Sequence, residues 1–250
     1  MVNAVDPRIS AACTRADDGL WAALARSQGG DACHPATGKL VFPAYRSDRL
    51  RVSEQEARFA FVEALCSGPL LYSVEVPTSK RYQFAGKSHL SAQTDLSIHD
   101  PAGNPMCNVE FKAKGFSPLG KEHFPIYKDL QKLLREPRWG LWFHLLEAVN
   151  NSTINDLLSV MAREMERVRD EFSTDIEAPG LTIHICVLKH GFSIQRDVAL
   201  AGTAGASTSS LGRLDLEVSR SGLVKGNDSS GWAVHARSDR ASNHDVQPTG

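Results

Sequence analysis

Three charged residues in the middle of the chain have the types and spacing of a metal-dependent hydrolytic site: Asp95, Glu110 and Lys112. Glu110 and Lys112 are two positions apart, so on a β-strand their side chains project from the same face. Carboxylates are the hard oxygen ligands that Mg²⁺ uses together with water and substrate phosphate oxygens. A bound Mg²⁺ activates water and offsets negative charge during phosphodiester hydrolysis, and a nearby lysine can orient that water. The residue types therefore predict a phosphodiesterase site.

The segments that carry these residues are predicted to form a β-hairpin. Residues 91–99 alternate between apolar and polar, with Asp95 on the polar face. The sequence DPAGNP at 100–105 is a strong turn signal, and residues 107–114 alternate again. Where the register permits it, the hairpin brings Asp95 beside the other two charged residues on one face.

Helices and further strands are predicted on both sides of this hairpin. Ser53 and Glu56 form a capping-box pair at the start of a helix with a clear apolar stripe, which ends before Gly68. The other expected elements are strands at 70–77 and 82–84, a helix at 125–136, a strand at 140–146, a helix at 153–172 and a strand at 181–188. This order predicts an α/β fold with a mixed sheet.

The pattern T-D-(14 residues)-E-F-K, from Thr94 to Lys112, resembles the core signature of the PD-(D/E)xK nuclease superfamily. The surrounding elements are also similar to that superfamily over residues 50–150: a helix with an early glutamate, a three-stranded meander, a helix and a further strand. Thr94 departs from the pattern, because the superfamily often has proline there. The resemblance implies the restriction-endonuclease-like fold, in which helices flank a mixed β-sheet.

The resemblance also implies a role for each residue of the motif. Asp95 and Glu110 would ligate Mg²⁺, with Mn²⁺ as an alternative metal and the Phe111 backbone carbonyl as a further ligand. Lys112 would act on the nucleophilic water. A glutamate from the first helix often completes such sites, and Glu54 is favoured because it shares the apolar stripe that faces the sheet. The implied activity is that of a metal-dependent nuclease.

The expected partner is nucleic acid, with DNA favoured over RNA. The net charge of −1 argues against a surface coated in positive charge, but basic residues outnumber acidic ones between Lys112 and Arg138. Within 128–133 the sequence resembles the polar helix that flanks the site in several such families. Phosphate contacts, which make binding sensitive to salt, are expected from Lys114, Lys121, Lys128 and Lys132.

The composition, 42% hydrophobic and 23% charged, is typical of a soluble globular protein. No apolar run approaches the ~18 residues of a membrane span. The first residues contain an acid and a proline where a signal peptide would need basic and then apolar residues. The sequence therefore predicts a cytoplasmic protein without a membrane partner, and its cysteines, which form no CxxC motif, are expected to be reduced thiols.

Three regions are expected along the chain. Residues 1–50 are interpreted as an irregular N-terminal segment with a short helix at 20–25. Residues 51–200 form the nuclease-like domain. Residues 201–250 are a low-complexity tail, partly disordered, with a late strand at 214–218.

Other interpretations stay open at this point. Glu-Phe-Lys on a strand is most simply a solvated face, and each acid taken alone could be a surface residue. A second hypothesis is a non-catalytic nucleic-acid-binding or assembly module on the same fold, and a third is an unrelated α/β protein. The wide apolar face of the helix at 153–172 could serve a homodimer or a larger assembly. His144 and His184 lie within apolar strands, which favours histidines of the core over catalytic ones.

Overall fold

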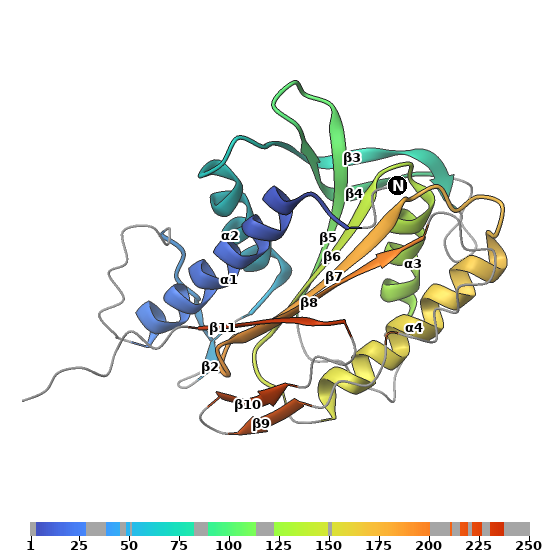
Figure 1. Ribbon diagram of the computed structural model, residues 1–250. Coiled ribbons are helices and arrows are strands. Elements are labelled where there is room, and N and C mark those ends of the chain that lie inside the picture. The colour runs from blue at the N-terminus through green and yellow to red at the C-terminus, as the bar shows by residue number, and fades with distance from the viewer. Residues whose placement is uncertain are drawn as a thin grey trace, which may run out of the picture.

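The computed structural model describes residues 4–28, 39–45, 49–50, 52–82, 90–113, 123–149, 152–200, 211, 216–219, 222–226 and 231–237. Within these ranges the chain has an α/β architecture in which four helices surround a seven-stranded mixed sheet (Figure 1). The helices are α1 (Pro7–Ser27), α2 (Glu54–Cys66), α3 (His123–Arg135) and α4 (Thr153–Glu171). The predicted α/β class, with helices flanking a mixed sheet, is confirmed.

The large sheet has the strand order β11-β8-β7-β6-β5-β4-β3. Its members are β3 (Leu71–Tyr82), β4 (Leu90–His99), β5 (Pro105–Ala113), β6 (Trp139–Leu146), β7 (Gly180–Val187), β8 (Phe192–Ala199) and β11 (Ala233–Ala236). Two small antiparallel pairs lie apart from it: β1 (Ala44–Tyr45) with β2 (Arg49–Leu50), and β9 (Leu216–Ser219) with β10 (Gly222–Gly226). Of these, β9 overlaps the late strand expected at 214–218.

The sheet combines an antiparallel meander with a parallel centre. β3, β4 and β5 are consecutive antiparallel strands, whereas β5, β6 and β7 run parallel to one another. β8 is antiparallel to β7, and β11 is antiparallel to β8. Parallel neighbours need a crossover connection, which α3 supplies between β5 and β6 and α4 between β6 and β7. β6 and β7 are buried along their whole length and largely apolar, because both of their faces are covered.

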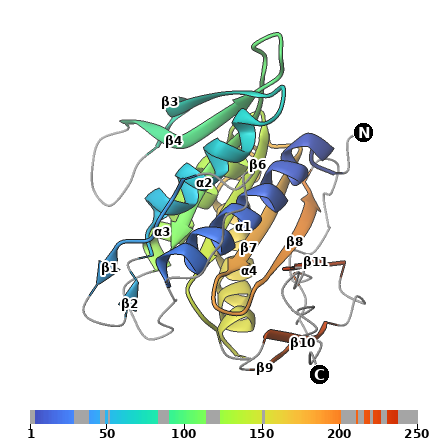
Figure 2. The same ribbon diagram turned by 90° about the vertical axis from the view of Figure 1, so that its left-hand side faces the viewer.

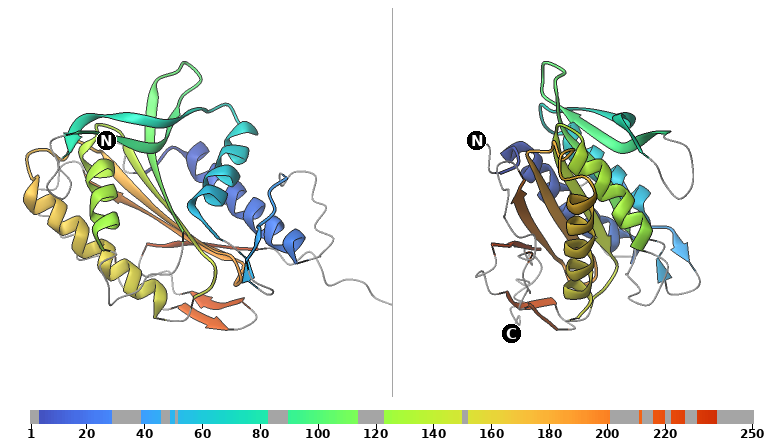
Figure 3. Two further views of the ribbon diagram at one scale, coloured as in Figure 1. Left: turned by 180° about the vertical axis from the view of Figure 1, so that it is seen from behind. Right: turned by 90° about the vertical axis from the view of Figure 1, so that its right-hand side faces the viewer.

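Helices cover the sheet on both sides, so the molecule has three layers. α1 and α2 lie side by side on one face (Figure 2), and α3 and α4 lie on the other (Figure 3). The first face buries one apolar core, which includes Leu20 and Phe61, and the second buries another, which includes Leu130 and Met161. The polar residues of the central strands are consequently shielded from water wherever a helix lies over them.

The N-terminal segment differs from its expected form. Residues 7–27, interpreted as irregular apart from 20–25, form one helix whose first turn contains Pro7 and is capped by Asp6. The Asp6 carboxylate accepts a hydrogen bond from the Arg8 backbone N–H at 2.8 Å. The pattern was obscure because alanine, cysteine and glycine make up much of the buried stripe. α1 packs in the same apolar core as α2, so it is part of the body of the fold.

The predicted hairpin is confirmed in β4 and β5. Asp100 closes its turn by accepting hydrogen bonds from the backbone N–H groups of Ala102 and Asn104, at 2.9 and 2.8 Å. Gly103 has a φ of 88°, which only glycine adopts without strain. The strand expected at 70–77 continues as β3 to Tyr82, because an irregular register between Pro77 and Arg81 maintains the pairing with β4. The rest of the strand expected at 82–84 lies outside the described residues.

The C-terminal region contributes more structure than the sequence indicated. β8 was not predicted, and β11 lies in the segment expected to be disordered. Trp232, which precedes β11, is 1% exposed and its indole N–H donates to the Leu211 carbonyl at 3.0 Å. Residues 238–250 lie outside the described ranges. Among the described residues, no helix is long and apolar enough to cross a membrane.

Candidate functional site

Asp95 lies where β4 and β5 part. The register pairs of these strands run from His99 with Pro105 to Leu96 with Val109. At the next position of β4 a side chain replaces the backbone as the hydrogen-bond acceptor for β5: the Asp95 Oδ2 accepts a hydrogen bond from the Phe111 backbone N–H at 2.8 Å. Its other oxygen, Oδ1, lies 2.9 Å from Nη2 of Arg58 on α2. Asp95 is therefore held at the fork by one backbone bond and one ion pair.

The two faces of β5 are both buried, but they have opposite character. Val109 and Phe111 pack into the core under α2, whereas Glu110 and Lys112 alternate to the face that α3 covers. Glu110 is 1% exposed, and Lys112 retains 19% exposure of its side chain. The interpretation of Glu-Phe-Lys as a solvated strand face is wrong for Glu110, because a helix lies over it.

Five charged side chains form a continuous set of ion pairs, called here the Glu110 cluster: Glu54, Glu110, Lys112, Asp129 and Lys132. The Lys132 Nζ lies 2.6 Å from Oε2 of Glu110 and 2.9 Å from Oδ1 of Asp129. The Lys112 Nζ lies 2.7 Å from Oδ2 of Asp129 and 3.5 Å from Oε1 of Glu54. The cluster joins α2, β5 and α3, which come from separate parts of the chain.

The predicted site residues therefore meet, but in two adjoining groups. Glu54, Glu110 and Lys112 belong to the cluster, and Asp95 lies beside it with Arg58. Glu54 stands at the start of α2 with 46% of its side chain exposed, at the open end of the site. Asp95 and Glu110 are close enough for the Asp95 charge to act on the ionisation of Glu110.

Glu110 is the member of the cluster whose ionised form is least favoured by its surroundings. Burial raises its pKa well above the usual range, and the charges of Asp129 and Asp95 act in the same direction, while Lys132 opposes them. Its Oε1 atom is buried without a hydrogen-bond partner among the described residues. An unpaired oxygen on a buried carboxylate is unfavourable, because no group replaces the lost hydration.

Lys112, Lys132 and Asp129 are held in their ionised forms. Burial acts to lower the pKa of Lys112, but the carboxylates of Asp129, Glu54 and Glu110 together outweigh it and the pKa is raised. Burial likewise opposes ionisation of Lys132 and Asp129. Glu110 and Asp129 nevertheless raise the pKa of Lys132, and the two ammonium groups lower the pKa of Asp129. Asp129 is thus the carboxylate around which both lysines are arranged.

Carboxylate oxygens converge at the site, and the unpartnered Oε1 of Glu110 suits a hard cation such as Mg²⁺. The neighbouring oxygens already have cationic partners: Arg58 on Asp95, and Lys112 and Lys132 on Asp129. Within the described ranges, no group of three or more histidine, cysteine, aspartate or glutamate side chains is arranged to hold a metal ion. The donor chemistry fits a divalent cation, provided that side-chain cations give way to it.

The residues expected to contact nucleic acid are only partly described. Lys114 and Lys121 lie outside the described residues. Lys128 is half-buried on α3. Lys132 is 5% exposed, and its ammonium also donates to the Gln93 backbone carbonyl at 3.0 Å. In this conformation all three N–H donors of Lys132 have protein acceptors, so its expected contact with phosphate stays a prediction that requires rearrangement.

Two members of the site were not assigned from the sequence. Asp129 precedes Lys132 by three positions, which places both on one face of a helix; that spacing was a usable signal within the polar segment 128–133. Arg58 lies off the apolar stripe of α2 and offers no comparable signal. Its guanidinium also lies 3.7 Å from Oε1 of Glu75, a residue with a φ of 50° on β3.

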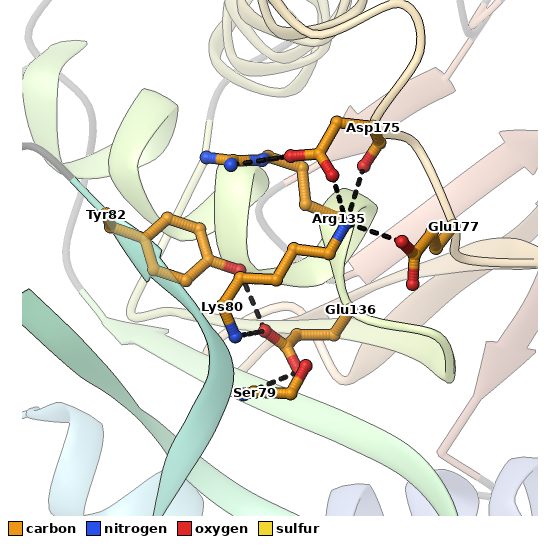
Figure 4. A network of polar contacts seen from close by, with 7 residues as sticks. All are labelled: Ser79, Lys80, Tyr82, Arg135, Glu136, Asp175 and Glu177. Carbon is orange, nitrogen blue, oxygen red and sulfur yellow. Dashed lines mark hydrogen bonds and ion pairs between the residues drawn. The ribbon is translucent and has the colours of Figure 1, made fainter.

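A second polar network lies at the C-terminal end of α3 and is shown in Figure 4. It is called here the Glu136 network, and its members are Ser79, Lys80, Tyr82, Arg135, Glu136, Asp175 and Glu177. Glu136 is fully buried. Its Oε2 accepts from the backbone N–H and the hydroxyl of Ser79, at 3.0 and 2.7 Å. Its Oε1 accepts from the Lys80 backbone N–H at 3.1 Å and the Tyr82 hydroxyl at 3.0 Å.

The outer part of the Glu136 network consists of ion pairs. The Lys80 ammonium contacts the Asp175 carboxylate, the Asp175 carbonyl at 3.3 Å and Glu177 Oε1 at 2.7 Å. Arg135 donates to Oδ2 of Asp175 at 2.7 Å, and its guanidinium lies over the Phe172 ring at 4.0 Å. The network fastens the irregular part of β3 to α3 and to the segment after α4.

The buried histidine His184 belongs to a third polar group, which is structural. Its Nε2 lies 3.0 Å from Oδ1 of Asp17, and the Ser193 hydroxyl donates to Oδ2 of the same carboxylate at 2.6 Å. In a nucleophilic triad the serine would contact the histidine, and all three side chains here are buried. The expectation that His144 and His184 are core histidines is confirmed by their exposures of 4% and 2%.

In comparisons with known proteins, no family model, no curated protein and no solved structure matches this chain. Functional inference therefore depends on the residues and geometry of the site.

Proposed function

We propose that this protein is a Mg²⁺-dependent nuclease that hydrolyses phosphodiester bonds in nucleic acid, with DNA as the first substrate to test. The observation that carries the proposal is the buried Glu110 carboxylate, whose Oε1 has no described partner and which is flanked by Asp95 and Lys112. A buried carboxylate left unsatisfied beside a fixed ammonium is more typical of a functional site than of a structural one.

The order of elements supports the same proposal. α2, the meander β3-β4-β5, α3 and β6 follow one another as in the restriction-endonuclease-like fold that the motif implies. We assign the chain to that fold as part of the proposal. Asp95 then lies within β4, and Glu110 and Lys112 lie near the end of β5, with α2 supplying Glu54 and α3 lying across the site.

Each residue has a defined part in the proposed reaction. Asp95, Glu110 and the Phe111 carbonyl would hold Mg²⁺, or Mn²⁺ as an alternative. When bound, the metal supplies Lewis-acid stabilisation of the charge that develops on the scissile phosphate. Lys112 orients the attacking water and offsets negative charge, and Glu54 at the exposed end of the site positions the Lys112 ammonium. Asp129 keeps that ammonium protonated and aligned.

The test is cleavage of plasmid and single-stranded DNA by the full chain in Mg²⁺, Mn²⁺ or EDTA. Cleavage is expected with either metal and not in EDTA. Lys112→Ala should lower its rate by about 10²-fold or more, because the group that orients the water is lost. Asp95→Asn, which keeps an acceptor for the Phe111 N–H, should lower it as well.

The matched control is Lys80→Ala, which removes another lysine bound to two carboxylates but outside the site. It should leave the cleavage rate unchanged. Cleavage that persists in EDTA, or that Lys112→Ala and Lys80→Ala reduce equally, would show that the proposed chemistry is wrong. Falling cleavage with rising salt is expected from the phosphate contacts of the basic segment.

A second candidate function is a non-catalytic nucleic-acid-binding or assembly module on the same fold. The observation in its favour is that Arg58 and Lys132 already pair with Asp95 and Glu110, the acids that would hold a metal. This function predicts nucleic-acid binding that is unchanged by EDTA and by Lys112→Ala, together with no cleavage. Filter binding in EDTA, run beside the cleavage assay, separates the two functions.

A further inference from the structure

The Lys132 side chain stands out because its ammonium is enclosed by acceptors. Nζ lies 2.6 Å from Glu110 Oε2, 2.9 Å from Asp129 Oδ1 and 3.0 Å from the Gln93 carbonyl oxygen. A lysine ammonium has three N–H donors, and all three are engaged. Lys132 is 5% exposed, so this arrangement lies inside the protein and not at its surface.

The acceptors around Nζ are the oxygen types that bind hard divalent cations: two carboxylates and one backbone carbonyl. The acidic residues alone would not make this a cation site. The second observation is the Oε1 atom of Glu110, which is buried with no hydrogen-bond partner among the described residues. Its other oxygen, Oε2, is the atom that lies 2.6 Å from the Lys132 Nζ, so the carboxylate that carries the unpartnered oxygen is directed at the position of the ammonium.

The geometry points to Lys132 as the resident cation of the candidate site, whose ammonium occupies the position in which Glu110, Asp129 and the Gln93 carbonyl hold a divalent cation. Ammonium and metal then exclude each other, and metal binds when the Lys132 side chain swings away. Asp129 and Gln93 become ligands in addition to those expected from the motif. The inference rests on the proposed metal dependence for its biological meaning, but the exclusion itself is tested without any activity measurement.

Charge explains why both cations cannot be held together. The ammonium and a divalent cation in contact with the same two carboxylates would repel each other strongly at short range in a buried site. Mg²⁺ binds oxygen at about 2.0–2.1 Å, so its ligands must approach more closely than they approach Nζ. Removing the ammonium should therefore raise metal affinity, whereas removing Glu110 should lower it.

The experiment is calorimetric titration of the full chain with MnCl₂ and MgCl₂. Lys132→Met removes the ammonium and retains an apolar side chain of similar length. It should bind Mn²⁺ about tenfold more tightly than the unmodified chain or better, because a competing contact charge is absent. The same variant with Glu110→Gln added should lose that gain. Lys132→Gln provides a second neutral variant if the methionine variant does not fold.

Lys80→Met is the matched control, because Lys80 also contacts two carboxylates and one carbonyl. It should bind Mn²⁺ no more tightly than the unmodified chain. A thermal-melting curve with and without Mn²⁺ gives an independent measurement: the metal should raise the melting temperature of Lys132→Met by more than that of the unmodified chain.

The outcomes separate this inference from the proposed function. If the unmodified chain binds metal through Glu110 and Lys132→Met binds it no more tightly, the inference is overturned and metal-dependent hydrolysis stands. If Lys132→Met binds metal and the unmodified chain does not, the inference holds and the proposed activity fails. Binding by neither protein, or a gain that survives Glu110→Gln, overturns the inference.

Discussion

Glu110 and Glu136 are two carboxylates that α3 helps to bury, and they are equally hidden from solvent, with exposures of 1% and 0%. Glu136 receives two hydrogen bonds on each oxygen. Glu110 has one oxygen on the Lys132 ammonium and the other without a described partner. Their pKa values move in opposite directions, because burial outweighs the favourable contacts of Glu110 whereas the donors around Glu136 outweigh its burial.

The difference shows that two carboxylates at the same depth can have their hydrogen-bonding capacity satisfied to different extents. The four donors to Glu136 are neutral backbone N–H and hydroxyl groups, which hold the carboxylate in one position and satisfy both of its oxygens. In the Glu110 cluster the carboxylates are instead paired with lysine ammonium groups, and the Oε1 atom of Glu110 is left without a hydrogen-bond donor among the described residues. Burial alone therefore does not distinguish these two carboxylates, whereas the number of hydrogen bonds that each receives does.

The largest expected effect is on folding stability. Glu136→Gln replaces one acceptor oxygen with an NH₂ group, which is a donor and would face the N–H or O–H groups that now donate to that oxygen. It should therefore lower the free energy of unfolding by about 3 kcal/mol. Glu110→Gln should change it by less than about 1 kcal/mol, because Lys132 keeps Asp129 and Gln93 and a buried charge is removed. Urea unfolding of both variants measures the contrast, and equal losses would contradict it.

The pH dependence of stability should differ in sign between the two residues. The pKa of Glu136 is lowered on folding, so its contribution is present above the ordinary glutamate value of about 4.3 and is lost on acidification. The pKa of Glu110 is raised, so its contribution is largest below that value and declines as the pH rises.

These signs are measured by urea unfolding from about pH 4 to 7. The stability deficit of Glu136→Gln, relative to the unmodified chain, should shrink as the pH falls. Glu110→Gln should gain stability, relative to the unmodified chain, as the pH rises. If the free energy of unfolding of the two variants changed with pH in the same way, the pKa values of the two carboxylates would not shift in opposite directions on folding.

The smallest expected effect concerns the outer ion pairs of the Glu136 network. Lys80→Met removes contacts with Asp175 and Glu177, both of which are partly exposed. Water and salt screen such pairs, so the free energy of unfolding should fall by about 1 kcal/mol or less. Chemical unfolding in low and high salt measures this loss, which should diminish as salt is added. A loss as large as that of Glu136→Gln would show that the outer ion pairs stabilise the fold as much as the buried Glu136 contacts do.

Local sequence patterns were sufficient for the elements that carry the motif. The turn DPAGNP and the alternation on either side of it predicted β4 and β5, and the spacing of apolar residues predicted α2, α3 and α4. Glu54 was placed beside Lys112 for a similar reason, because helical spacing directs it towards the sheet. These inferences needed only neighbours within one element or one turn.

The partners of the motif could not be read in the same way. Lys132 and Asp129 reach Glu110 and Lys112 only because α3 crosses back over β5, which depends on packing between distant segments. The bonds to Glu136 depend on the irregular register of β3. Most of α1, beyond the short helix expected at 20–25, was missed because its buried face consists largely of small residues. β11 was missed because its pairing partner β8 was not recognised.

The pairing of β11 with β8 has a consequence for the order in which the chain can fold. β11 aligns residues 233–236 with residues 195–192 of β8. On a ribosome, β8 emerges well before its outer neighbour, so its unpaired N–H and C=O groups form an open sheet edge during synthesis. Another nascent chain could add a strand there. Completion of this edge is thus a late, long-range event, set by the distance along the chain and not by the local propensity of either strand.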